Sequence, residues 1–292
     1  MIDYKKFAMK SIDYLYKYIT DNHLNSLVLG ISGGIDSTVV ACLAYIACKT
    51  VEVQLIGRSL PAHTNNPDEI NTATLVGRAF CSDFKEVSIE RMFGIIADEL
   101  ELNEGKMTPL QLGNIKARLR MIYLYNLASI HRGCVLDTDN RTEHELGFWT
   151  IHGDVGDLNC GLIHLWKTEV YELANYLANE ASGLTQEQRI ALKESIKLIP
   201  TDGNGVKSGG DCAQFGLDNY EQVDDVLKTM YYDTQINPDF KGFQENPIRE
   251  SEYIRLIDSY NEQGVDKVMM LHQNSMFKRE HLPIYPKLDN LV

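Results

Sequence analysis

The residues Leu27-Val28-Leu29-Gly30-Ile31-Ser32-Gly33-Gly34-Ile35-Asp36-Ser37-Thr38 connect an apolar, strand-like run to the helix-like run Val39 to Ala47. Two adjacent glycines allow a tight turn whose N–H groups point into one concavity. The serine hydroxyls add donors, and the next helix adds the positive end of its dipole. A simple turn between a strand and a buried helix could use the same glycines. The complete Ser-Gly-Gly-Ile-Asp-Ser string in this context is more specific, and it predicts a pyrophosphate-binding loop.

This loop carries an acid where the familiar phosphate loop carries a lysine. A Gly-x-x-x-x-Gly-Lys-Ser/Thr loop places its lysine against the terminal phosphates of a nucleotide. Here Asp36 stands at the end of the loop, where it could hold a magnesium ion. The residues therefore indicate handling of pyrophosphate and not transfer of a terminal phosphate. The string resembles the loop of the ATP pyrophosphatases, which cleave ATP to AMP and pyrophosphate.

Strand-like and helix-like segments alternate along the first half of the chain. The apolar patterns predict strands at 27–31, 51–56, 84–89 and 134–138, and helices at 4–20, 39–49, 67–80, 90–102 and 115–130. This alternation predicts an α/β fold with a doubly wound, mainly parallel sheet that binds ligands beyond the carboxyl ends of its strands. We expect one domain over 1–292, with its core sheet within about 24–180 and additional helices and irregular segments over about 181–292.

Weaker local signals concern the second half. Thr168 is expected to cap a helix, and Asp218 with Glu221 resembles a capping pair for another. The glycine-rich residues 202–210 are expected to form a loop that could close over a site, and 233–250 reads as irregular.

Composition excludes several classes of protein. The net charge of −13 gives no bulk attraction to nucleic acid, and no apolar run approaches the roughly 20 residues of a membrane span. The six cysteines form no Cys-x-x-Cys pair, which favours scattered reduced thiols and a cytoplasmic location over a disulfide or zinc framework.

Three further strings contain candidate functional residues. Asn114 and Arg118 are four residues apart, so they project from one helical face and could hold a ribose and an acidic group. Glu143 follows an expected strand and could join Asp36 as an oxygen ligand of Mg²⁺. Lys167 opens an expected helix, where a cation opposes the helix dipole, so an anionic partner would account for it. Solvated surface charge is the alternative for the basic residues.

Together these strings resemble ammonia-dependent NAD synthetases, in the same order along nearly the whole chain. The resemblance runs from Gly30–Ser37 through Gly113–Met121, Thr138–Glu143 and Gly147–Asp154 to Lys278-Arg279. It implies the Rossmann-like fold of adenine nucleotide alpha hydrolases and a homodimer. A glutaminase-containing relative would need a further large domain, so free ammonia is the implied nitrogen source.

The resemblance also implies residue roles. It places on ATP the residues Gly30, Ile31, Ser32, Gly33, Gly34, Ile35, Asp36, Ser37, Thr138, Lys167 and Thr201. It places on deamido-NAD the residues Asn114, Arg118, Asp157 and Lys278. Asp36 and Glu143 would hold Mg²⁺, and Asp36, Lys167 and Asp154 would be catalytic. Arg58 is the candidate for an arginine that relatives place beside the adenine, although its Arg-Ser-Leu-Pro string has one extra residue.

Some positions depart from the pattern of these relatives. Ile151 stands where they have a substrate-binding lysine, and Leu158 stands where they have a substrate-binding aspartate, with Asp157 shifted one place earlier. Asp137 replaces the glycine that usually precedes the threonine, and Asp211-Cys212 replaces an Asp-Glu pair. The departures concentrate on the dinucleotide side, whereas the ATP and metal positions are intact.

The implied reaction is the ATP-dependent amidation of deamido-NAD with ammonia through an acyl-adenylate, which gives NAD, AMP and pyrophosphate. Two alternatives remain at this point. One is a pyrophosphatase of the same loop class that amidates or thiolates another acceptor. The other is a nucleotide sensor without catalysis, which the replacement of lysine by Ile151 would suggest.

Overall fold

The computed structural model describes residues 2–201, 210–236 and 248–279. Within them, five parallel strands form one sheet in the order β3-β2-β1-β4-β5. These are β1 (Ser26–Gly30), β2 (Gln54–Ser59), β3 (Asp83–Glu86), β4 (Gly133–Asp137) and β5 (Leu158–Asn159). The order reverses between β1 and β4, and the predicted doubly wound parallel sheet is confirmed.

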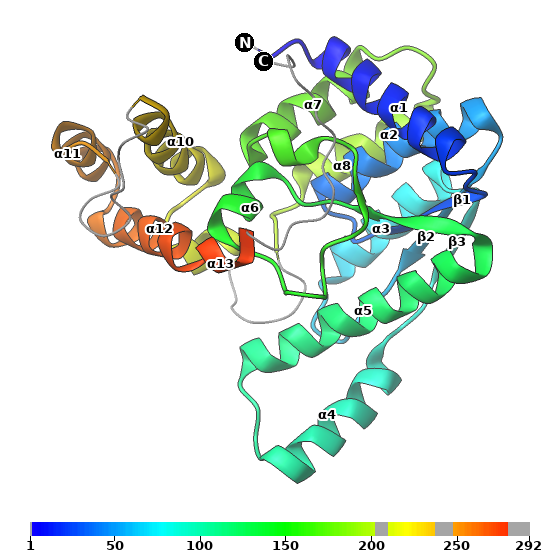
Figure 1. Ribbon diagram of the computed structural model, residues 1–292, viewed down its shortest axis with the longest axis horizontal. Coiled ribbons are helices and arrows are strands. Elements are labelled where there is room, and N and C mark those ends of the chain that lie inside the picture. The colour runs from blue at the N-terminus through cyan, green and yellow to red at the C-terminus, as the bar shows by residue number, and fades with distance from the viewer. Residues whose placement is uncertain (1, 202–209, 237–247, 280–292) are drawn as a thin grey trace.

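Helices cover both faces of this sheet (Figure 1). One face packs on α1 (Tyr4–Asp21), α2 (Ile35–Val51), α3 (Pro67–Phe80), α7 (Lys167–Asn179) and α8 (Gln186–Lys197), which share one large buried cluster with the inner strands. The other face packs on α5 (Pro109–His131), with α4 (Glu90–Glu104) outside it. Leu27, Val28 and Leu29 of the central strand β1 are all apolar because side chains on both of its faces are buried.

Several predicted boundaries are wrong. The strand predicted at 84–89 is β3, which begins at Asp83 and ends at Glu86. The strand predicted at 51–56 is Gln54–Ser59, because α2 continues to Val51 and Glu52 ends it in a left-handed conformation with φ of 57°. The last residues of β2 are polar but buried, so apolar pattern alone does not find them. The helix predicted at 115–130 begins at Pro109, where Thr108 and Gln111 form a capping box.

A second layer of helices lies to one side of the sheet core (Figure 1). It contains α9 (Asp211–Phe215), α10 (Tyr220–Ile236), α11 (Glu250–Ser259), α12 (Glu262–Asn274) and α13 (Met276–Arg279). These helices pack around their own buried cluster together with α6 (Arg141–Leu146), which follows β4. A short 3-10 turn, η1 (Leu162–His164), leads into α7.

Both capping predictions in this half are wrong. Thr168 lies inside α7, whose N-cap residue is Trp166. Before α10 the side chain of Asn219 accepts the N–H of Gln222 at 3.0 Å, so the cap is one residue later than the predicted Asp218 pair. The segment read as irregular, 233–250, includes the end of α10 and the start of α11, and its residues 237–247 lie outside the described residues. The predicted loop over 202–210 also lies outside them except for Gly210.

In the part of the chain that the structure describes, no helix is long and apolar enough to cross a membrane. All six cysteines are unpaired thiols.

Candidate active site

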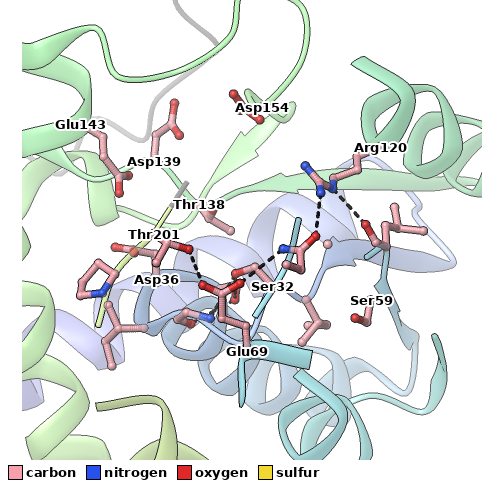
Figure 2. A pocket seen from close by; sticks show the side chains of 18 of the residues that line it. Ser32, Asp36, Ser59, Glu69, Arg120, Thr138, Asp139, Glu143, Asp154 and Thr201 are labelled. Carbon is pink, nitrogen blue, oxygen red and sulfur yellow. Dashed lines mark hydrogen bonds between the residues drawn. The ribbon is translucent and has the colours of Figure 1, made fainter. Parts of the chain in front are cut away.

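The candidate site lies where the strand order reverses, beyond the carboxyl ends of β1 and β4. The loop 30–37 follows β1, and Thr138 follows β4. Both border a cavity of about 290 Å³, which α3, α5, α6, α7 and the segment 198–201 complete. Figure 2 shows side chains from these separate segments turned toward one space. This is the position at which open α/β sheets bind ligands.

Hydrogen bonds between its own serines, and one glycine, fix the conformation of the loop 30–37. The Ser32 hydroxyl lies 3.0 Å from that of Ser37 and accepts the N–H of Gly34 at 3.2 Å. Gly33 has φ of +88°, and a Cβ there would lie 2.3 Å from the backbone oxygen of Glu69. The backbone of Gly33 therefore lies too close to α3 for any side chain to fit. Because glycine has no Cβ, the loop can pass between this helix and the cavity.

A buried lysine joins the two predicted metal ligands. The Nζ of Lys167, a side chain only 3% exposed, lies 2.5 Å from Asp36 Oδ2 and 2.9 Å from Glu143 Oε1. Asn140 donates from its side-chain amide to Asp36 Oδ1 at 2.8 Å, and it also caps α6 in a box with Glu143. Four residues from three separate segments of the chain thus form one hydrogen-bonded cluster beside the candidate phosphate loop.

Charge and burial oppose each other in this cluster. Burial raises the pKa of Glu143 to about 7, although Lys167 partly offsets that rise. Burial alone would lower the pKa of Lys167, but the carboxylates of Asp36 and Glu143 hold it well above its usual value. The lysine is therefore positively charged at neutral pH, and its charge is what permits two carboxylates to lie together in a buried site.

Asp36 and Glu143 are suitable oxygen donors for a hard cation, and both already face one positive charge. Within the described residues, no group of three or more histidine, cysteine or acidic side chains is arranged to hold a metal ion. A magnesium ion at this place would therefore need further oxygens, which the phosphates of a nucleotide can supply.

Other acidic residues face the same cavity. Asp154 Oδ2 accepts the N–H of Thr150 at 2.7 Å, which orients its carboxylate at the cavity wall. Asp139 lies between Glu143 and Asp154 in Figure 2, and burial together with Asp137 raises its pKa well above the usual value. Thr201 also lines the cavity, and its hydroxyl donates to the buried carboxylate of Glu69.

Predicted residues for the second substrate lie on another side. The Asn114 side chain accepts the hydroxyl of Thr150 at 2.9 Å, and Arg118 donates to the carbonyl of Ile151 at 3.3 Å. Lys278 donates to the carbonyls of Gly147 at 2.6 Å and Trp149 at 2.5 Å. All three thus contact the segment 147–151, and burial lowers the pKa of Lys278.

That segment borders a second cavity of about 790 Å³, which Tyr125, Ile151, His152 and Asp157 help to line. Tyr125 also lines the first cavity, so the two cavities adjoin. Asp157 accepts the hydroxyl of Tyr125 at 2.7 Å and the N–H of Val135 at 3.3 Å. Its carboxylate is therefore tied to α5 and β4 at the wall of this cavity.

The comparisons with known proteins agree with this geometry. A family model described as NAD synthase matches residues 7–282. The chain belongs to the NAD synthase family. It is 30% identical to the NH3-dependent NAD(+) synthetase of Pyrococcus furiosus over 284 residues, which is 97% of this chain and 96% of that protein.

Two solved structures share the fold. The NMN synthetase of Francisella tularensis has a TM-score of 0.72 and 22% identity, and covers 98% of this chain and 100% of its own. The NH3-dependent NAD synthetase of Campylobacter jejuni, in complex with nitrate, has a TM-score of 0.65 and 23% identity, and covers 97% and 99%.

For this NAD synthase family member, several site residues were not among those predicted. Asp139, Asn140, Glu69 and Arg120 all lie in or beside the first cavity. The Asn140-x-x-Glu143 spacing is a capping box that the sequence does display, and it could have identified Asn140. Arg120 donates to the carbonyl of Leu60 at 3.0 Å, a contact that no local pattern reveals.

The departures from the family pattern have distinct structural settings. Leu158 is fully buried in β5, so its side chain cannot contact a ligand. Ile151 lines the second cavity with an apolar side chain. Arg58, the candidate for the adenine side, is 2% exposed and donates to Asp83 Oδ2 at 2.8 Å, so its guanidinium ties β2 to β3.

Proposed function

We propose that this chain catalyses the amidation of deamido-NAD with ammonia, using ATP. The nicotinate carboxylate would attack the α-phosphorus of ATP, release pyrophosphate and form an acyl-adenylate. Ammonia would then attack the activated carbonyl and expel AMP. The observation that carries this proposal is the Asp36–Lys167–Glu143 cluster beside a lysine-free phosphate loop at the switch point of the sheet.

Each part of the site has a task in this reaction. The loop 30–37 supplies N–H and hydroxyl donors for the phosphates of ATP, and Thr138, Lys167 and Thr201 border the same cavity. Asp154, held by the N–H of Thr150, lies in the wall toward the second cavity and would orient the ammonia or the reacting carboxyl group. Positioning and charge stabilisation account for the chemistry, since no enzyme nucleophile is required.

We further propose that Asp36 and Glu143 hold Mg²⁺ when ATP is bound. The metal would neutralise phosphate charge and make pyrophosphate a better leaving group. This is supported by the two carboxylates of Asp36 and Glu143, which both pair with the ammonium group of Lys167 in the structure.

A homodimer in the cytoplasm completes the proposal. The outer surfaces of α4 and α5 expose an unusual number of apolar side chains: Ile95, Leu102, Leu110, Ile122 and Ile130. Apolar surface of this kind is typical of a subunit interface. The second substrate would occupy the adjoining second cavity, near Asn114, Arg118, Asp157 and Lys278.

The decisive assay measures AMP and pyrophosphate from ATP, ammonia and deamido-NAD. Nicotinate mononucleotide is tested in parallel, because Ile151 and Leu158 remove two polar substrate contacts and one similar fold is an NMN synthetase. Turnover with deamido-NAD supports the proposal, whereas turnover only with the mononucleotide changes the acceptor. Formation of ADP and orthophosphate would refute the adenylation chemistry.

A further inference from the structure

At the N-terminus of α7, Glu169 accepts the N–H of the N-cap residue at 2.9 Å, but the N-cap side chain accepts no N–H of the first turn. Its N-cap residue, Trp166, makes no side-chain capping hydrogen bond, and its first helical residue, Lys167, places a cation where the helix dipole favours an anion. The same lysine supplies the ammonium group between Asp36 and Glu143. The first turn of α7 therefore depends on contacts from elsewhere in the fold.

Those contacts come from Asp224 on α10, in the second helical layer. Asp224 is 1% exposed, and its Oδ2 accepts the N–H of Thr168 at 2.9 Å and the hydroxyl of Thr168 at 2.7 Å. Its Oδ1 accepts the hydroxyl of Thr142 at 2.5 Å. The Thr142 oxygen in turn accepts the N–H of Lys167 at 2.8 Å. One carboxylate thus reaches both residues that begin α7, directly or through a single hydroxyl.

The Asp224 carboxylate also fixes α6, the helix that carries Glu143, one of the two partners of Lys167. Thr142 precedes Glu143 on α6, so the bond from Thr142 to Asp224 holds α6 and α7 in one relation to α10. On α10, the neighbours Val223, Val226 and Leu227 are buried apolar residues, and the nearest positive charge is that of Lys228 one turn along the helix. A carboxylate in such a place is costly unless its oxygens are satisfied, and here they accept from Thr142 and Thr168.

We propose that Asp224 is a positioning residue for Lys167. By anchoring Thr168 and, through Thr142, the N–H of Lys167, it fixes the backbone from which the lysine reaches Asp36 and Glu143. The second helical layer is in this way part of the nucleotide site, although its residue touches no substrate. The inference rests on the proposed function only where it treats Lys167 as a ligand of ATP.

The test measures binding of α,β-methylene ATP to the full chain by calorimetry, because this analogue cannot release pyrophosphate. Asp224→Asn keeps the shape of the side chain but leaves one acceptor oxygen for the donors of Thr142 and Thr168. We therefore expect binding of the analogue to weaken about 10-fold. Asp225→Asn is the matched control. Asp225 contacts Arg255 and Tyr260 within the second layer, and its variant is expected to bind within about threefold of the wild type.

Thr142 provides a second pair of variants that tests the relay with less risk to folding. Thr142→Ser keeps the hydroxyl and should bind like the wild type, whereas Thr142→Val removes it and should weaken binding about as much as Asp224→Asn does. If the role of Thr142 is purely structural, the loss of analogue binding in the two variants should instead be proportional to their loss in melting temperature.

A double-mutant cycle identifies the residue through which Asp224 acts. In a Lys167→Met background, Asp224→Asn should weaken binding by less than about twofold, because the group that it positions is gone. Equal weakening in both backgrounds, or equal effects of the Asp224 and Asp225 variants, overturns the positioning role.

The assay separates this proposal from the proposed function. If the wild type binds the analogue but makes no AMP with deamido-NAD, the function fails and the positioning role is still decided by the cycle. A wild-type chain that does not bind the analogue overturns both.

Discussion

Replacing Lys167 with methionine removes the one positive charge found between Asp36 and Glu143 in the described part of the chain, while it keeps the length of the side chain. The lysine is buried, and both of its ion-pair distances lie below 3 Å. Breaking a buried pair by removal of one partner costs about 3–5 kcal/mol, because the remaining charge is uncompensated. At roughly 2–4 °C per kcal/mol for larger domains, the melting temperature should fall by about 6–20 °C at pH 8.

The pH dependence of this loss has a definite sign. Burial raises the folded-state pKa of Glu143 to about 7, and loss of Lys167 raises it further. A carboxyl group whose pKa is raised by folding costs nothing below its unfolded pKa, near 4.5, and costs most above its folded pKa. The difference in melting temperature between the variant and the wild type should therefore be clearly smaller at pH 5.5 than at pH 8.

The assay is thermal unfolding at both pH values, with and without Mg²⁺. Lys197→Met is the control, because Lys197 forms an exposed pair with Glu194 and its loss should cost under about 1 kcal/mol. Mg²⁺ should restore part of the lost stability of the Lys167 variant, since it can replace the missing charge. An unchanged melting temperature at pH 8, or a loss that does not shrink on acidification, would refute the electrostatic account.

Three further outcomes are expected. Asp36→Asn should lower pyrophosphate release at least about 100-fold with an unchanged circular dichroism spectrum, and undiminished release would remove Asp36 from the reaction. Gly33→Ala should abolish ATP binding and lower the melting temperature, because its Cβ would lie 2.3 Å from a backbone oxygen of α3; normal calorimetric binding would show that the loop can move away. Ile122→Glu combined with Ile130→Glu should shift sedimentation from dimer to monomer, whereas Ile254→Glu on α11 should not; a wild-type monomer would exclude the dimer.

The sequence predicted most of the sheet because its inner strands are apolar and its helices have a regular pattern. It located the phosphate loop because all the necessary residues lie within Gly30–Ser37. It failed at the ends of elements, as at β2, whose polar residues Arg58 and Ser59 are buried by neighbours that are distant in sequence. The short β5 and helix α8 were not predicted individually, although Thr185 and Gln188 form a capping box at the start of α8.

Side-chain partnerships were the hardest features to predict. Lys167 and Asp36 are 131 residues apart, so no local pattern connects them. Arg58 was a candidate for the adenine side only through the resemblance; it lines the first cavity, and the sequence did not reveal that its guanidinium also binds Asp83 on the adjacent strand. The spacing of Asn140 and Glu143 indicates a capping box, but only the fold shows that Asn140 also donates to Asp36.

Lys167 shows how a local anomaly can indicate a distant partner. A lysine at the first position of a helix is unfavourable by itself, and the sequence indicated an anionic partner as one explanation, with solvated surface charge as the alternative. In the structure, Asp36 and Glu143 are the two anions that pair with the lysine at the candidate nucleotide site. A third anion, Asp224, accepts an N–H at the start of α7, where the positive lysine side chain gives no stabilisation. Lys167, its partners Asp36 and Glu143, and the capping residue Asp224 therefore form one interacting unit. The position of each residue is explained by its contacts with the others. We infer that substitutions at these four positions will be strongly non-additive, in contrast to pairs that lie on opposite faces of the sheet.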